Sequence, residues 1–401
     1  MYYKHTICFL KLAIINQQSA ISHYDFIITG AGCAGLSLLM RLLQEPSLSS
    51  KQILIIDQTP KNKNDRTWCF WETSAGLFEA IVHHRWHDIQ FLSQQFSNTI
   101  AIAPYTYKMI HGLEFYNYVI QFAQQFPNVT FKYDTVKSIV NHHKSVEVKL
   151  NYVSFTADFV FNSIIFQQPE LPKGKYYLLQ HFKGWVINTQ QPAFNPNMAT
   201  FMDFTVSQQH GTTFMYVLPT STTEALVEYT LFTEALLAET DYDDALKNYI
   251  KKQLGITEYT IEHEEFGIIP MTNIDFPNYD GRIVNIGIAG GQAKGSSGYA
   301  FQFIQKRTEQ IVHSLVKNQH PFTKTTFSDK KFKFYDSVLL NVLHHKKLNG
   351  DAVFADIFQK NSPNTIFRFL DNNSNLLEDI QIMNSVPITV FLKAALQELF
   401  I

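Results

Sequence analysis

The stretch HYDFIITGAGCAGLSLLMRLL, residues 23–43, decides the fold of this 401-residue chain. It begins as an apolar strand, passes through a glycine-rich turn and continues as an apolar helix. In the turn, Gly30 permits the tight backbone geometry, Gly32 lets the main chain approach a pyrophosphate, and Gly35 lets the helix pack closely on the strand. The first N–H groups of the helix face that site with a partial positive charge.

A second apolar strand follows in KQILIIDQT, residues 51–59. Its near-continuous apolar character is typical of a parallel strand buried on both faces. Asp57 ends this strand 27 residues after Gly30, close to the spacing of a carboxylate that binds ribose hydroxyls. The two strands and the helix between them therefore predict a Rossmann-type dinucleotide-binding domain.

The patterns along the rest of the chain predict an α/β protein, α+β overall, in which a β-rich segment interrupts the nucleotide-binding domain. Alternating apolar and polar residues indicate an inserted antiparallel sheet with one helix near residues 241–254. The last segment reads as helical, with breaks at residues 349–350, Pro363 and Pro387. We expect a disordered leader (1–21), a first nucleotide-binding part (22–170), a substrate domain (171–270), a second nucleotide-binding part (271–325) and a helical C-terminal region (326–401).

Two further motifs suit the binding of a dinucleotide. In DRTWCFW, residues 65–71, Arg66 could reach a phosphate and the tryptophans could flank a planar ligand; the alternative is a surface arginine beside core aromatics. In GRIVNIGIAGGQAKGSSGYAF, residues 281–301, glycines again follow a strand and precede a helix. The glycines that we expect to contact the ligand there are Gly290, Gly291 and Gly298.

Three carboxylates lie on predicted strands of the inserted sheet: Asp203, Glu228 and Glu265. Leu226, Glu228 and Thr230 share one face of their strand. A carboxyl that faces an apolar cavity has a raised pKa and can donate a proton at neutral pH. The alternative is that Glu228 is solvated on the outer face of the sheet.

Composition excludes several classes of function. The formal net charge of −2 gives no electrostatic footprint for nucleic acid. Three cysteines form no disulfide framework and suit a reducing compartment. We interpret the adjacent histidine pairs (83–84, 142–143 and 344–345) as surface residues and predict no metal site. Aromatic residues make up 14% of the chain, which fits an aromatic-rich core or a long apolar cavity.

Taken together, these motifs resemble the lycopene beta-cyclase family of carotenoid biosynthesis. The resemblance spans residues 24–399. It is carried by YDFIITGAGCAGLSL, DRTWCFW, QHFKGWVINTQQPAFNPNMATFMDF, YVLPTSTTEALVEYTLF, GIIPMT, GIAGGQAKGSSGYAFQFIQ and FRFLDNNSNLLEDIQIMNSVPITVFLKAAL.

The resemblance implies a redox-neutral cyclisation of the ends of lycopene to beta-ionone rings, with FAD in its reduced form and NAD(P)H as the reductant. It makes Glu228 the essential acid, and Asp203 is our second candidate for acid–base work. Tyr229 stands where the family has a second acidic residue, which puts any supporting role of that neighbour in doubt. Gly295 stands where the family commonly has proline and should make the flavin loop more flexible.

Because lycopene or another linear carotene is wholly apolar, we expect a peripheral protein on the cytoplasmic face of the cell membrane, with other carotenoid enzymes as further partners. The C-terminal helices or the aromatic region at residues 354–358 would contact lipid. The alternative functions are a flavin-dependent oxidoreductase, such as a monooxygenase or prenyl reductase acting on an apolar substrate, and a non-catalytic nucleotide-binding module.

Overall fold

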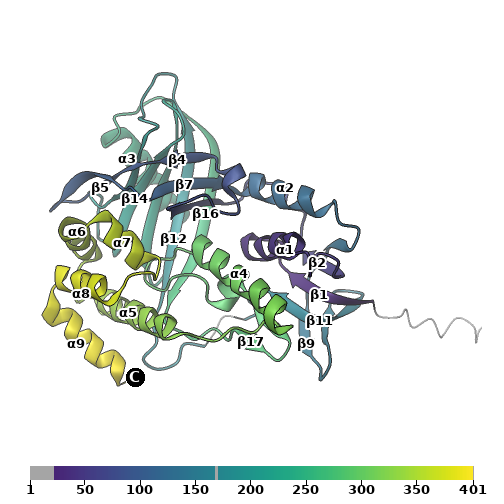
Figure 1. Ribbon diagram of the computed structural model, residues 1–401. Helices are drawn as coiled ribbons and strands as arrows, with labels where there is room; N and C mark the ends of the chain where they lie inside the picture. Colours follow the sequence, from purple (N-terminus) through teal and green to yellow (C-terminus); the bar gives the residue numbers. More distant parts are fainter. Residues whose placement is uncertain (1–21, 168–169, 401) are drawn as a thin grey trace, which may run out of the picture.

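The protein is described by a computed structural model over residues 22–167 and 170–400, so the predicted leader lies outside the described residues. Two large sheets and a C-terminal set of helices make up the molecule (Figure 1). A smaller three-stranded sheet joins them. The α/β class with a Rossmann-type domain is confirmed.

The nucleotide-binding sheet is built around the strand that the sequence predicts first. β1 (His23–Thr29) runs parallel to both β2 (Ile53–Asp57) and β11 (Ser154–Asn162). The strand order is β17-β18-β11-β1-β2-β8, and β9 and β10 extend the sheet through β11. The bounds of the other strands are β8 (Val129–Tyr133), β9 (Ser138–Asn141), β10 (Val146–Lys149), β17 (Tyr279–Asp280) and β18 (Ile283–Asn285).

Helices cover one face of this sheet. α1 (Cys33–Gln44), α2 (Gly112–Ala123) and α4 (Phe301–Asn318) share a core with β1, to which Phe26 and Ile28 point. Ten of the twelve residues of α1 are buried, which explains why its sequence is apolar all round. The chain thus enters this domain at β1 and returns to it at β17, after the other sheet has been built.

The second sheet has the strand order β16-β12-β15-β14-β13-β5-β6. Five of its strands lie in the predicted substrate segment, the last of them ending two residues beyond it. The bounds of all seven are β5 (Asp88–Leu92), β6 (Ser97–Ala101), β12 (Tyr177–Asn188), β13 (Met198–Asp203), β14 (Thr212–Pro219), β15 (Glu224–Thr233) and β16 (Thr260–Thr272). Two features differ from the prediction. β5 and β6 come from the segment assigned to nucleotide binding, and β5 pairs with β13 in parallel, so the sheet is not wholly antiparallel. Alternation reveals a strand but not its partner, which here lies about a hundred residues away along the chain.

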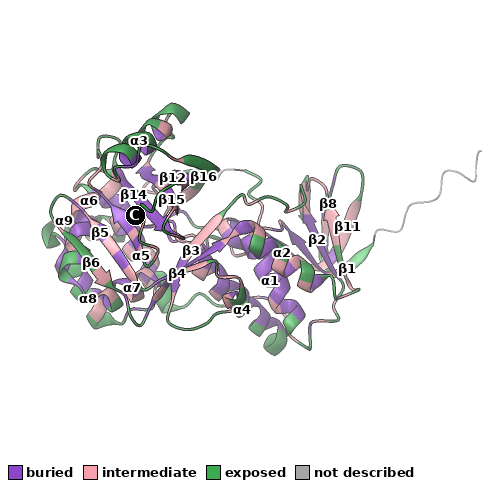
Figure 2. Cartoon of the chain, turned by 90° about the horizontal axis from the view of Figure 1, so that it is seen from above, coloured by how far each residue is buried: buried purple, intermediate pink, exposed green. Residues whose placement is uncertain are grey.

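A three-stranded sheet stands between the two large ones. It consists of β3 (Thr67–Glu72), β4 (His84–Trp86) and β7 (Thr106–His111), with β7 in the centre. Figure 2 shows β3, β4 and α4 between the two halves of the molecule, with buried residues continuous across this region. Phe70 of β3 stacks on Phe301 of α4 with ring centroids 4.2 Å apart, which couples the halves.

The helix breaks that the sequence predicts near the C-terminus are confirmed. α6 begins at Gly350, Pro363 is the first residue of α7, and Pro387 is the N-cap of α9. Local capping supports the other starts: Thr326 and Asn375 each form a capping box with the third residue of the following helix. The helices are α5 (Phe327–His344), α6 (Gly350–Lys360), α7 (Pro363–Leu370), α8 (Leu376–Ser385) and α9 (Ile388–Leu399). α3 (Glu239–Lys252) covers the far face of the second sheet.

Candidate active site

Two carboxyl groups meet on the face of the second sheet that looks toward β3 and β7. Glu228 of β15 and Glu265 of β16 are both in register with Gly184 of the strand between them, β12. Because glycine has no side chain, the carboxyls can approach each other across it. A Cβ placed on Gly184 would lie 3.2 Å from Glu265 Cγ, which leaves no room for a larger residue without displacing the pair.

The environment of the two carboxyl groups favours a state in which one of them is protonated. Burial and the repulsion of Glu265 raise the pKa of the Glu228 carboxyl. Burial also raises the pKa of Glu265, although contacts with Thr67 and the charge of Arg66 oppose the shift. Two neighbouring carboxyls in a low-dielectric site do not both ionise near neutral pH, so the pair retains a proton. The Thr230 hydroxyl donates to Glu228 Oε1 at 2.7 Å and orients the carboxyl.

Aromatic hydroxyls and rings surround Glu228. Burial raises the pKa of Tyr107, Tyr216 and Tyr299, and the negative charge of Glu228 adds to the shift in each of them. The hydroxyls of Tyr216 and Tyr299 lie 3.0 Å apart. Trp71 packs edge-on against Tyr299, with centroids 4.7 Å apart. Glu228 itself keeps a partly accessible surface.

A series of rings connects this region to the surface. Phe367 of α7 lies 5.0 Å from Trp71 and 5.8 Å from Phe201, measured between ring centroids. Phe367 also lines a cleft with about 500 Å³ of empty space, open to solvent, between β5–β6 and α6–α7. The residues lining this cleft are Ile89, Phe96, Asn98, Ile100, Phe358, Gln359, Asn361, Pro363, Ile366 and Phe367. The aromatic richness of the sequence thus includes a continuous apolar wall from the cleft toward Glu228.

The structure does not bring Asp203 to this cluster. Its Oδ1 accepts hydrogen bonds from the backbone N–H and the hydroxyl of Thr205 at 2.8 and 2.6 Å, and its Oδ2 accepts one from the Tyr249 hydroxyl at 2.7 Å. Tyr249 belongs to α3, which packs on the opposite face of the sheet from Glu228. Asp203, predicted as a second acid–base candidate, therefore ties α3 to the sheet on the face opposite Glu228.

The first glycine turn has the geometry that a dinucleotide needs. Gly30 has φ +99°, and a Cβ on Gly35 would lie 2.0 Å from the Gly30 carbonyl oxygen, so helix and turn are in direct contact. By contrast, a Cβ on Gly32 would meet no atom of the described chain within 4 Å, so open space lies in front of it. No side chain of the described residues caps the N-terminus of α1. The open space and the uncapped helix end fit a bound pyrophosphate.

Asp57 closes the same turn from the end of β2. Its Oδ2 accepts a hydrogen bond from the Ala31 N–H at 2.7 Å and lies 3.2 Å from Lys61 Nζ. The carboxylate thus stands beside the glycine turn, where the spacing of the sequence places it.

Arg66, which the sequence suggests as a phosphate contact, is exposed. Its Nη1 donates a hydrogen bond to the Phe266 carbonyl at 3.4 Å, at the edge of β16. It stands near Glu265 as well, so it connects the loop after β2 to the carboxyl pair.

The second glycine loop lies against the first. A Cβ on Gly287 would be 3.0 Å from the Ala34 side chain of α1. Gly291 and Gly298 have φ of +72° and +70°, and Gly290 has backbone 2.4 Å from its Cβ position, so glycine is required in this loop. Among the described residues, the buried Gln292 Oε1 and Ser297 Oγ have no hydrogen-bond partner. Such unpartnered groups fit a ligand held between the two loops.

Gly295, predicted to loosen this loop, lies in close contact with the chain of β16. A Cβ there would be 2.7 Å from the Thr272 carbonyl oxygen. Its neighbour Lys294 is buried and donates to Asp336 Oδ1 at 2.8 Å and to Asn372 Oδ1 at 2.7 Å. The loop is therefore anchored to α5 and to the segment after α7 on either side of the glycine position.

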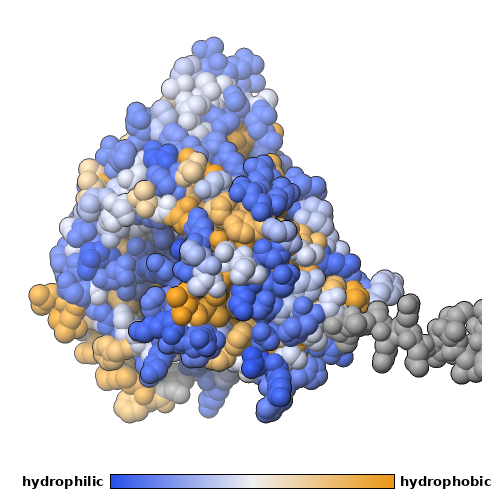
Figure 3. All heavy atoms as spheres, turned by 45° about the vertical axis from the view of Figure 1, so that its right-hand side comes forward, coloured by the Kyte–Doolittle hydropathy of each residue, from blue (hydrophilic) through white to orange (hydrophobic). Residues whose placement is uncertain are grey.

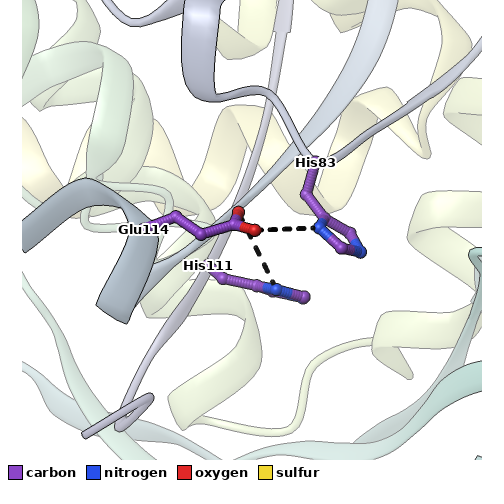
Figure 4. A group of neighbouring side chains, drawn as sticks. All are labelled: His83, His111 and Glu114. Carbon is purple, nitrogen blue, oxygen red and sulfur yellow. Dashed lines mark hydrogen bonds and ion pairs between the residues drawn. The ribbon is translucent and has the colours of Figure 1, made fainter. Parts of the chain in front are cut away.

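His83, a member of one of the adjacent histidine pairs, is not an isolated surface residue, because it contacts His111 and Glu114. His83 and His111 stack with ring centroids 3.9 Å apart, and both Nδ1 atoms face Glu114, at 3.3 and 3.9 Å (Figure 4). Burial and the neighbouring His83 lower the pKa of His111. The donor atoms of these three residues all lie within 4.8 Å of one another, so the described residues place three potential metal ligands together where the sequence predicts no metal site. The group also joins the segment before β4 to the start of α2, through the contact between His83 Nδ1 and the Glu114 carboxylate.

A family description matches almost the whole chain. The family model described as lycopene cyclase protein covers residues 25–396. The chain belongs to the lycopene cyclase family. A lycopene beta-cyclase from Pantoea ananas is 28% identical over 266 residues, which are 62% of this chain and 63% of that protein. The match thus spans less than two thirds of that relative.

Solved structures share the fold of this lycopene cyclase family member. A single-substitution variant of HpxO from Klebsiella pneumoniae, complexed with FAD, superposes with a TM-score of 0.61 at 12% identity, over 91% of this chain and all of that chain. A geranylgeranyl bacteriochlorophyll reductase-like protein from Thermoplasma acidophilum gives 0.58 at 11% identity, over 93% and 96%. At such identities the likeness concerns the fold alone.

The structure also brings together residues that motif reasoning does not join. The sequence marks Glu265 only as a carboxylate on a strand, and it does not single out the tyrosines near Glu228. Their signal is present in the register: Glu228 and Glu265 flank one glycine, and Tyr216 is the partner of Glu228 on β14. The Tyr216–Glu228 pairing belongs to a local hairpin, but the pairing across Gly184 is revealed only by the sheet, because long stretches of chain separate β12 from β15 and from β16.

Proposed function

We propose that this protein is a lycopene beta-cyclase, which closes beta-ionone rings at the ends of lycopene by acid catalysis without net redox change. Membership of the lycopene cyclase family supports the substrate class. The observation that carries the chemistry is the buried Glu228–Glu265 pair, which retains a proton beside an aromatic wall.

We propose that Glu228 donates this proton to a terminal alkene carbon of the polyene. The proton forms a new C–H bond, a tertiary carbocation develops, and a neighbouring double bond attacks it to close the six-membered ring. Loss of a ring proton then fixes the new double bond, and the carboxylate pair accepts that proton back, so the pair ends as it began. The apolar wall excludes water, which would otherwise trap the cation.

The residues of both glycine loops fit FAD, as the open space at Gly32 and the unpartnered Gln292 and Ser297 indicate. Gly30, Gly32, Gly35 and Asp57 would hold the phosphates and ribose, and the loop 287–298 would hold the remainder. In its reduced form, maintained by NAD(P)H, the flavin would supply negative charge close to the developing cation. Tyr216, Tyr299 and the partly accessible Glu228 are the groups of the chain that would face the substrate.

The experiment is expression of the chain in a lycopene-accumulating host, followed by pigment analysis. We expect cyclised carotene from the wild type and unchanged lycopene from Glu228→Gln, provided that the purified variant retains its flavin absorbance and thermal midpoint. Unchanged lycopene from the folded, flavin-loaded wild type would defeat the proposal. Stoichiometric consumption of NAD(P)H with product would favour the oxidoreductase alternative instead.

A further inference from the structure

The last helix presents an apolar row to solvent. The inner face of α9 packs on α5, where Ala394 is fully buried against Val338 and Val342. Its outer face exposes Ile388, Leu392, Leu396 and Leu399, spaced at helical intervals and between 49% and 65% exposed. A surface helix of a soluble protein normally carries polar residues on that face, so an apolar outer face indicates a contact.

The preceding helix continues this row. α8 packs beside α9 and exposes Leu376, Leu377, Ile380 and Met383, again on one face and between 40% and 78% exposed. We call the eight exposed side chains of α8 and α9 the C-terminal ridge. Figure 3 shows apolar side chains gathered at the lower left of the molecule, the region that α8 and α9 occupy in Figure 1.

The ridge belongs to a well-anchored part of the fold. Glu398 of α9 accepts hydrogen bonds from the Tyr176 hydroxyl and from Asn341 Nδ2, both at 2.8 Å. Asp379 of α8 is fully buried and bonded to Lys331 Nζ at 2.6 Å. These contacts fix the orientation of both helices, so the ridge is held as a defined face.

Charges beside the ridge are basic. Lys347 and Lys393 lie close enough for Lys393 to lower the pKa of Lys347, after the larger effect of burial. Among the described residues, neither lysine has an acidic side chain within ion-pair distance. The acids of α8 and α9 are already bonded within the fold, since Glu378 pairs with Arg368 at 2.9 Å and Asp379 and Glu398 are held as described. The charge of Glu398 partly offsets that of Lys347, which leaves Lys393 on α9, within the described part of the chain, as the lysine without an opposing acid. An apolar face with such a lysine beside it complements an anionic lipid surface.

A second copy of the chain fits less well. A twofold contact through the ridge would place the same basic groups of both copies near each other, and like charges at an interface oppose association. Residues 354–358, which the sequence also suggests as a lipid-contacting region, do not form a docking surface. Phe354 and Phe358 are 4% and 5% exposed and pack in the core against Phe204 and Phe91.

We propose that the C-terminal ridge docks this protein on an anionic phospholipid bilayer, with α8 and α9 lying in the interface. This inference rests on the proposed function, because the wholly apolar substrate of that function resides in the bilayer. No helix within residues 22–167 and 170–400 has the length and apolar character needed to cross a membrane. Docking by an interfacial helix pair needs no such segment.

The test is co-sedimentation of the full-length, flavin-loaded protein with vesicles of phosphatidylglycerol and phosphatidylcholine. We expect the double variant Leu392→Ser/Leu396→Ser to lower the partition coefficient by roughly tenfold per leucine. The matched control is Leu171→Ser/Leu236→Ser, which alters two leucines of similar exposure outside the ridge and should bind like the wild type. Lys393→Glu should weaken binding to the anionic vesicles but leave binding to pure phosphatidylcholine unchanged.

Several outcomes would overturn the proposal: no binding of the wild type, equal binding of the ridge variant, or a wild-type dimer in sedimentation that the ridge variant abolishes. Two measurements separate this proposal from the proposed function. The ridge variant should still cyclise lycopene supplied in detergent micelles, and Glu228→Gln should bind vesicles like the wild type. Vesicle binding without any cyclase activity would therefore defeat only the proposed function, and activity without ridge-dependent binding would defeat only the docking.

Discussion

Replacing Glu265 with glutamine tests the carboxyl pair most directly. Glu228 must be protonated to act as an acid, and repulsion from Glu265 helps to keep it so. Glutamine has the same size but no charge, so it removes that repulsion. The pKa of Glu228 should then fall toward the value set by burial alone, and activity should be lost first at the alkaline end of the pH range.

The magnitude follows from the position of the two groups, which flank Gly184 on adjacent strands and repel each other when both are charged. Two unit charges about 4 Å apart interact by ~4 kcal/mol at an effective dielectric constant of about 20. Since one pKa unit corresponds to ~1.4 kcal/mol, even a third of that interaction shifts the alkaline limb down by about one unit. Above the new limb, turnover should fall by roughly tenfold, while turnover well below it should stay close to the wild-type value.

Stability should change in the opposite direction. A carboxyl whose folded pKa is raised costs stability as pH rises from its unfolded pKa through its folded pKa. Removing one member of the pair removes part of this cost, so Glu265→Gln should melt at a higher temperature than the wild type at about pH 8 and at a similar temperature below about pH 4. A residue that merely supported the fold would give a lower melting temperature at both values.

The assay is lycopene turnover in micelles as a function of pH, with melting curves on the same samples. Glu264→Gln is the control, because Glu264 is the next residue on β16 but pairs with Lys183 at 3.3 Å on the exposed side. It should leave the alkaline limb in place. If Glu265→Gln and Glu264→Gln give the same pH profile as the wild type, Glu265 does not set the proton affinity of Glu228 and the reasoning is refuted.

Four further variants, three at glycines and one at Asp203, have distinct expected outcomes. Gly32→Ala should fold with an unchanged melting temperature but lose flavin absorbance, whereas Gly35→Ala should itself be destabilised, because its Cβ would meet the Gly30 carbonyl at 2.0 Å. Gly184→Ala should cost about 1–3 kcal/mol of stability in denaturant titrations and slow turnover, since it crowds Glu265. Asp203→Ala should cost about 1–3 kcal/mol by leaving the Tyr249 hydroxyl unpaired, yet keep the wild-type pH profile of turnover; a shifted profile would return Asp203 to the list of catalytic candidates.

Helices, strands and turns that are determined by residues adjacent in the sequence could be predicted from it. The strand–turn–helix at residues 23–43 and the helix breaks at Gly350, Pro363 and Pro387 follow from local backbone preferences and apolar periodicity. The shared face of Leu226, Glu228 and Thr230 follows from the twofold period of a strand, and the Thr230–Glu228 hydrogen bond agrees with it.

What could not be predicted depends on pairing between distant segments. β5 joins the second sheet only through its pairing with β13, and β6 joins it only through β5, so neighbouring residues do not reveal the sheet to which they belong. The same limit applies to the active site, because Glu265 becomes relevant only once β16 is paired to β12 in the register that sets it opposite Gly184. Asp203 is the opposite case. Its residue type suggests acid–base chemistry, but it lies on the face of the sheet that α3 covers, where the Tyr249 hydroxyl donates a hydrogen bond to it.

The position of the carboxyl pair explains how a fold shared with flavin oxidoreductases could serve an acid-catalysed reaction. Glu228 stands on the substrate sheet, yet its neighbours come from the loop after β2, through Arg66 and Thr67 acting on Glu265, and from the segment after the second glycine loop, through Tyr299. Two of the three segments predicted to contact the dinucleotide, residues 65–71 and 281–301, therefore reach the carboxyl pair. Under the proposed function, a change of reaction type would need no new architecture, only a pair of carboxyls in register across one glycine of the second sheet.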